Sequence, residues 1–151
     1  MSLTKLRDNF EKKLHDGEAV ESQFLGILKR KDSTANKIAG NYKWADFNCA
    51  GKTYELKYDE MSDKTGNFAI EIRFKGKPSG LSTTTADYFV IADSEYFYQF
   101  DTFNLREFIK TNWHYLKDSI KFGGDENLSQ LILVNKDDLL NYLNHEQIQR
   151  E

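Results

Sequence analysis

Three residues in the first half of the chain have types and spacing that suit a divalent-metal site. Glu55 and Lys57 lie two positions apart in the segment 52–58, whose alternating pattern predicts a strand, so their side chains share one face. Asp46 lies nine residues before Glu55, and a hairpin turn at residues 50–51 would bring the two carboxylates together.

Two neighbouring carboxylates repel each other unless a cation lies between them. Ligand sets made only of oxygen suit Mg²⁺ or Mn²⁺. Lys57 adds a fixed positive charge that could orient a nucleophilic water or stabilise a pentavalent phosphate. The chemistry that this arrangement indicates is phosphodiester hydrolysis.

Glu21 is a candidate third acid. It falls on the face of a predicted helix that also carries Phe24, Leu25 and Leu28, so we expect it to point towards the sheet and to help hold a second metal. Taken singly, an acid early in a helix complements the helix dipole, and a Glu-x-Lys strand is an ordinary polar face. The combination in this order favours a metal site.

A second group of residues lies on the third predicted strand and in the loop after it. Glu71 is either a further acid of the site or the partner of Arg73 in a surface pair, and the sequence leaves both open. The loop 75–85 is rich in small and hydroxyl residues, so its backbone amides could approach a phosphate, or it could be an ordinary turn. The candidates for substrate binding are Glu71, Lys75, Lys77 and Ser79.

Other chemistry-bearing side chains receive weaker assignments. Asp87 is expected to cap a helix, and Tyr58 and Lys64 are weak candidates for touching DNA. Trp44 and Trp113 are expected to pack in the protein. The three histidines have no ligand spacing and receive no catalytic role; they are His15, His114 and His145.

The elements that must position these residues follow from periodicity and from turn signals. Helices are expected over 4–15, 18–31, 103–118 and 137–145, and strands over 42–48, 52–58, 68–74, 88–92, 96–100 and 131–134. The uninterrupted apolar run 88–92 predicts a strand buried on both faces. This order predicts an α/β domain spanning 1–151, with one mixed central sheet flanked by helices.

The charge distribution neither requires nor excludes a polyanionic partner. The formal net charge of −3 counts against nucleic-acid binding. Locally, however, residues 27–43 carry five basic side chains against Asp32 alone, and residues 73–77 carry three with no acid. Each cluster taken alone is typical of a solvated surface.

The compartment is expected to be cytoplasmic. The N-terminal residues lack an apolar signal segment, and no apolar run approaches the roughly 20 residues that span a bilayer, so no membrane partner is expected. The single cysteine, Cys49, excludes an intrachain disulfide and a cysteine-based zinc site.

The pattern formed by Glu21, Asp46, Glu55 and Lys57 resembles the PD-(D/E)XK nuclease superfamily, in particular its Holliday-junction-resolvase-like and small phage-type endonucleases. Ala45 stands where a proline often precedes the aspartate. The resemblance covers roughly residues 15–110 and continues through the runs 57–59, 65–71, 78–81 and 86–90.

The resemblance implies a restriction-endonuclease-like αβββαβ core and Mg²⁺- or Mn²⁺-dependent cleavage of duplex or branched DNA. It implies metal ligation by Asp46, Glu55, Glu21 and the backbone carbonyl of Leu56. A branched substrate would imply a homodimer, and a phage origin would imply the host cytoplasm. Two alternatives stay open: a catalytically inactive DNA-binding or structural protein of this fold, and an ordinary α/β interaction module.

Overall fold

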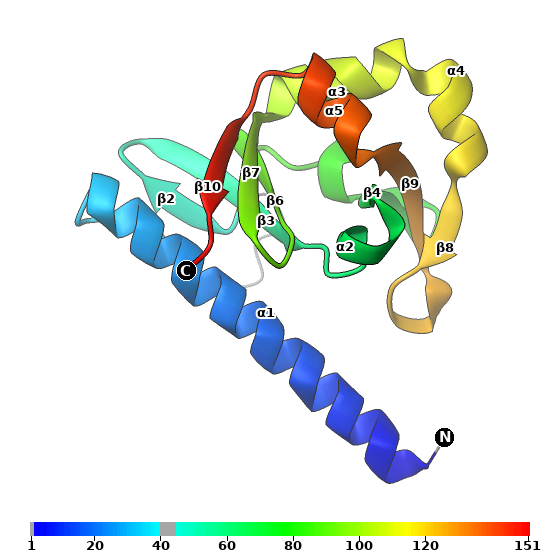
Figure 1. Ribbon diagram of the computed structural model, residues 1–151, viewed down its shortest axis with the longest axis horizontal. Coiled ribbons are helices and arrows are strands. Elements are labelled where there is room, and N and C mark those ends of the chain that lie inside the picture. The colour runs from blue at the N-terminus through cyan, green and yellow to red at the C-terminus, as the bar shows by residue number, and fades with distance from the viewer. Residues whose placement is uncertain (1, 40–44) are drawn as a thin grey trace.

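Two β-sheets and the helices around them form the computed structural model of the chain, which describes residues 2–39 and 45–151 (Figure 1). The first sheet contains, in spatial order, β1 (Asn36–Lys37), β2 (Phe47–Cys49), β3 (Lys52–Tyr58), β6 (Tyr88–Ala92), β7 (Tyr96–Asp101) and β10 (Glu146–Gln149). The second contains β5 (Lys77–Pro78), β4 (Asn67–Phe74), β9 (Ser129–Asn135) and β8 (Lys121–Gly123). The helices are α1 (Leu3–Lys31), α2 (Ser62–Thr65), α3 (Thr102–Thr111), α4 (Trp113–Leu116) and α5 (Lys136–Tyr142), with short turns η1 (Gly80–Ser82), η2 (Lys117–Ser119) and η3 (Asp125–Asn127).

The first sheet is mixed, because β3 and β6 run parallel while its other neighbouring strands are antiparallel. The expected α/β class with a mixed central sheet is therefore confirmed. The turn at residues 50–51 is also confirmed. Ala50 (φ 49°) and Gly51 (φ 79°) are both left-handed, as a tight two-residue hairpin requires.

The expectation of one sheet is wrong, because β4 does not extend the β2–β3 hairpin. β3 instead pairs with β6, and β4 pairs with β9 in the second sheet. The chain is redirected between them by α2, which ends at the left-handed Gly66. Asp59 fixes this path, because its Oδ2 accepts a hydrogen bond from the Ala69 N–H at 2.7 Å.

Helix α1 is a single helix, whereas the sequence predicted two. It begins with Ser2, whose Oγ accepts from the Lys5 N–H at 3.2 Å, and it runs through Gly17 without a break. A glycine costs a helix only about 1 kcal/mol, so it weakens this helix without ending it. The C-terminal half lies across the first sheet, and the N-terminal half extends away from the rest of the molecule (Figure 1).

The first sheet is covered by apolar residues on both faces. One face packs against α1, whose Val20, Phe24 and Leu28 join a cluster with alternate residues of β3, β6 and β7. The other face contributes Phe89 and Ile91 to a second cluster shared with the second sheet, α3, α4 and α5. The run 88–92 is therefore buried on both faces, as expected.

The C-terminal third departs from the expected helices. The helix expected over 103–118 divides at Asn112 into α3 and α4. The helix expected over 137–145 ends at Tyr142, and the chain then forms β10 along β7. His145 consequently lies outside the helix, with its ring centroid 5.8 Å from that of Phe100.

Part of the strand expected over 42–48 lies outside the described residues, as does Trp44. In the described part, β2 begins at Phe47. No described helix is both long enough and apolar enough to cross a membrane.

Candidate functional site

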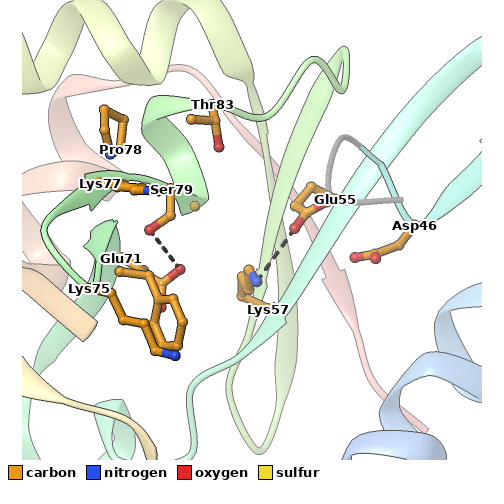
Figure 2. A pocket seen from close by; sticks show the side chains of 11 residues that line it. Asp46, Glu55, Lys57, Glu71, Lys75, Lys77, Pro78, Ser79 and Thr83 are labelled. Carbon is orange, nitrogen blue, oxygen red and sulfur yellow. Dashed lines mark hydrogen bonds and ion pairs between the residues drawn. The ribbon is translucent and has the colours of Figure 1, made fainter. Parts of the chain in front are cut away.

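A pocket of about 900 Å³ lies between β3 of the first sheet and the β4–β5 hairpin of the second (Figure 2). The residues that line it are Asp46, Glu55, Lys57, Glu71, Phe74, Lys75, Lys77, Pro78, Ser79, Gly80 and Thr83. Most of the residues selected from the sequence therefore meet at one place.

Strand β3 places Glu55 and Lys57 in this pocket. Its alternate residues Tyr54 and Leu56 are buried under α1, so Glu55 and Lys57 must face the other way. Lys57 Nζ lies 3.4 Å from Glu55 Oε1. Glu55 is only 7% exposed and lies opposite Phe89 in the sheet, which sets its carboxylate against the apolar core.

Asp46 immediately precedes β2 and is held in place by β3. Its backbone N–H donates to the Tyr54 carbonyl at 2.8 Å, and its Oδ2 accepts from the Leu56 N–H at 2.9 Å. This places Asp46 beside Glu55 at the edge of the pocket (Figure 2). The approach of these two residues, predicted from the hairpin, is confirmed.

The pKa values of both carboxyl groups are raised, so their ionised forms are disfavoured. The pKa of Glu55 is raised to about 7, first by burial and then by the charge of Asp46, although Lys57 offsets part of the rise. Burial also raises the pKa of Asp46, against the hydrogen bond from the Leu56 N–H. A cation bound between the two groups would favour both ionised forms.

Glu21 does not line this pocket. Its carboxylate forms an ion pair with Lys37 of β1. The charges of Glu21 and Lys37 act on the pKa of Asp46 in opposite directions, so this pair lies near the site without joining it. Among the side chains that the structure describes, no group of three or more His, Cys, Asp and Glu residues is placed to hold a metal ion.

Glu71 faces the site from β4 on the opposite wall. Its two carboxylate oxygens accept hydrogen bonds from Ser79 Oγ at 3.1 Å and Ser129 Oγ at 2.6 Å. Its charge contributes to the raised pKa of Glu55. Sequence reasoning missed Ser129, and no local signal marks it, because it lies 58 residues from Glu71 along the chain.

The loop expected over 75–85 is more ordered than predicted. Lys75 (φ 51°) and Gly76 (φ 77°) form a tight turn between β4 and β5, and η1 follows. Gly80 packs so closely on β4 that an added Cβ would lie 2.3 Å from the Glu71 carbonyl oxygen. Lys75, Lys77 and Ser79 do line the pocket, and Phe74 and Thr83 join them without having been predicted.

Two weaker assignments change. Asp87 caps no helix: its Oδ2 accepts from the N–H of Thr53 at 2.9 Å, which secures the start of β3 beside β6. Tyr58 lies outside the pocket lining, and the Arg150 guanidinium stacks 5.4 Å from the centre of its ring.

Comparison with known proteins adds no relative. No protein-family model matches the chain, and no curated protein matches it. The resemblance to the PD-(D/E)XK nucleases therefore rests on the residues of this chain alone.

Proposed function

We propose that this protein is a Mg²⁺- or Mn²⁺-dependent endodeoxyribonuclease that hydrolyses DNA phosphodiester bonds. The observation that carries the proposal is the meeting of Asp46 and the nearly buried Glu55 in one pocket, with Lys57 as the adjacent cation. Such a pair of acids, disfavoured in its ionised form, is suited to a divalent ion.

The donor set of the site fits Mg²⁺. This ion is commonly held by one or two carboxylates, with water and substrate phosphate completing its shell. Asp46 and Glu55 supply the carboxylates. The N–H of Leu56 donates to Asp46. Because the N–H and the C=O of a strand residue point to the same edge of the strand, the Leu56 carbonyl also points to the edge of β3 beside Asp46. When bound, the ion polarises a phosphate and lowers the pKa of a bound water.

The protein's own residues supply position and charge. Lys57, half exposed beside Glu55, can orient the attacking water and stabilise the charge that develops on the phosphate. In this proposal Glu21 is a third acid outside the pocket lining. It can ligate a metal only if its ion pair with Lys37 breaks. The packing of α1 on the sheet that carries the acids supports a restriction-endonuclease-like core.

The test is a cleavage assay with linear, nicked, flapped and branched DNA, in Mg²⁺, Mn²⁺ and EDTA. We expect cleavage only with metal, and Lys57→Ala should reduce the rate by about 100-fold or more because it removes the charge beside the phosphate. Lys121→Ala, an exposed lysine of β8 outside the pocket lining, is the matched control. Equal nicking by the wild type and Lys57→Ala would show that the activity does not come from this site.

Metal binding can be tested independently of activity. Crystals soaked in millimolar Mn²⁺ should show anomalous density between Asp46 and Glu55, and Asp46→Asn should remove it. An empty site in the wild type at that concentration would overturn the catalytic proposal. Cleavage of a branched junction would further require two such sites, so the proposal for that substrate includes a homodimer.

A second candidate is a DNA-binding protein of nuclease fold without catalysis. The ion pair between Glu21 and Lys37 favours it, because it keeps Glu21, one of the three acids that the resemblance implies, out of the pocket lining. DNA binding without metal-dependent cleavage would support this candidate.

A further inference from the structure

The pocket wall opposite the acids presents an aromatic ring together with basic side chains. Phe74, at the end of β4, is 38% exposed and lines the pocket. Lys75 Nζ lies 5.5 Å from the centre of the Phe74 ring, and Lys77 of β5 lines the pocket beside them. A large apolar side chain kept at the surface between cations is a feature of surfaces that bind nucleic-acid strands.

This wall is fixed in place by its own hydrogen bonds. The Lys75 N–H donates to the Leu128 carbonyl at 3.0 Å, and the Ser79 N–H donates to the Ile72 carbonyl at 3.0 Å. Ser79 Oγ is bound to Glu71, which Ser129 holds from β9. The Phe74 ring is thus carried on a paired hairpin, and little ordering is needed when a ligand binds.

Charge is divided across the pocket in a way that matches a phosphodiester chain. Asp46 and Glu55 lie on one side, and Lys75 and Lys77 on the other, with Lys57 between them (Figure 2). A strand that places one phosphate at the acids with their metal would extend its neighbouring phosphates over the lysines. Glu71 is an acid on the lysine side of the pocket, but Ser79 Oγ and Ser129 Oγ donate to its two carboxylate oxygens, and residues 73–77 contain no acid.

We propose that the β4–β5 hairpin binds an unpaired DNA strand, with a base stacked on Phe74 and phosphates on Lys75 and Lys77. This inference rests on the proposed function and narrows its substrate to DNA with a single-stranded segment, such as a flap or an overhang. The physical reason is that a base within a duplex is already stacked on its neighbours, so only an unpaired base has a face free for the ring. Phenylalanine has no polar atom to read a base, so binding should tolerate any sequence.

The experiment measures binding in EDTA and in Ca²⁺ by fluorescence anisotropy, with a labelled single-stranded oligonucleotide and its duplex. We expect the single strand to bind at least about tenfold more tightly, and Phe74→Ala to weaken its binding about tenfold to a hundredfold. Phe74→Trp should restore binding, because it retains the stacking face. The logarithm of the binding constant falls linearly with the logarithm of the salt concentration. Lys77→Ala should make this slope shallower by about 0.7, the value for one phosphate contact to a single strand.

Phe122→Ala is the matched control, because Phe122 is also an exposed aromatic residue (64%) but lies on β8 outside the pocket lining. Equal binding of single strand and duplex would overturn the inference. So would equal effects of Phe74→Ala and Phe122→Ala, provided that thermal melting shows both variants folded. Preferential binding of an acidic peptide at this wall would likewise overturn it.

The outcome is separable from the proposed cleavage. If the wild type prefers single strands but cuts no DNA in Mg²⁺ or Mn²⁺, the hairpin inference stands and the nuclease proposal fails. If it cuts DNA but Phe74→Ala leaves the binding and cutting of flapped DNA unchanged, the nuclease proposal stands and the hairpin inference fails.

Discussion

Glu55 is a buried acid that lies next to apolar side chains of the core. Its neighbour in register, Phe89, belongs to the core between the two sheets, and Lys57 beside it is opposite Ile91. Such a position disfavours the charged carboxylate, and the protein retains it at a cost in stability. Costs of this kind are characteristic of functional sites.

The pH dependence of stability follows from this residue. The pKa of Glu55 is about 7 in the folded protein against 4.5 for the ordinary group, so the folded state binds the proton more tightly. Stability of the metal-free protein should therefore fall as pH rises from about 4.5 to about 7. Glu55→Gln, which mimics the neutral acid, should be more stable than the wild type at pH 8 by up to about 3 kcal/mol and equal to it near pH 4.

Urea unfolding in EDTA at several pH values measures this difference. Glu60→Gln, at an exposed position, serves as the control and should show no such trend. Adding Mg²⁺ should narrow the difference at pH 8, because the ion stabilises only the ionised wild-type site. A Glu55→Gln variant that is less stable than the wild type at pH 8 without metal would contradict the prediction.

At the scale of elements, the close approach of η1 to β4 shapes one wall of the pocket. Gly80 has φ 54° and lies against the backbone of Glu71, with no room for a Cβ. The same segment carries Ser79, which holds the Glu71 carboxylate. The wall therefore depends on a glycine whose role is steric.

Gly80→Ala should destabilise the protein by about 1–3 kcal/mol, because it adds left-handed strain to overpacking. Gly26→Ala in α1 is the control: nothing lies within 4 Å of its added Cβ, and alanine favours the helix by about 1 kcal/mol. Thermal or urea unfolding should show that Gly80→Ala lowers the stability of the protein and that Gly26→Ala raises it. A neutral Gly80→Ala would mean that η1 is not packed on β4 as described.

For the whole molecule, a buried ion pair joins the two sheets whose separation forms the pocket. Lys136, at the end of β9 and the start of α5, places its Nζ 2.5 Å from Oδ2 of Asp93 in the β6–β7 turn. The same ammonium lies 5.3 Å from the ring centre of Phe68 and 5.5 Å from that of Tyr98. Burial alone would raise the pKa of Asp93, but hydrogen bonds from Lys136, Tyr96 and Glu95 outweigh burial and hold it below its ordinary value.

Lys136→Met should destabilise the protein by about 3–5 kcal/mol, because it leaves Asp93 buried without its cation. The wild-type pair contributes stability above the unfolded pKa of Asp93, and this contribution is lost as pH falls through the lower folded pKa. The loss caused by Lys136→Met should therefore be full at pH 7 and shrink in strong acid, as urea unfolding would show. Lys117→Met, at an exposed position, should change stability by less than about 0.5 kcal/mol; equal effects of the two variants would argue against the pair.

Local patterns in the sequence were sufficient to predict the wall of the candidate site that carries Asp46, Glu55 and Lys57. Strand alternation over 52–58 puts Glu55 and Lys57 on one face, and the turn at residues 50–51 brings Asp46 to them. The strands at 52–58 and 88–92 have the predicted bounds, because their apolar and polar spacing depends only on near neighbours. The helix break predicted near residue 17 and the helix end predicted at residue 145 were wrong, because packing and pairing with distant strands decide where those elements end.

Only the tertiary structure determines which residues lie across the pocket from Asp46 and Glu55. Which strand pairs with the free edge of β3 depends on contacts between segments far apart in sequence, so the division into two sheets, and the pocket between them, has no local signal. Likewise, no local signal predicts the hydrogen bond from Ser129 to Glu71 or the ion pair between Lys37 and Glu21. The sequence alone determined that two carboxylates and a lysine would meet, because one strand and one turn suffice for that. The opposing Phe74 and its lysines required the second sheet, because only long-range strand pairing carries that wall to the site.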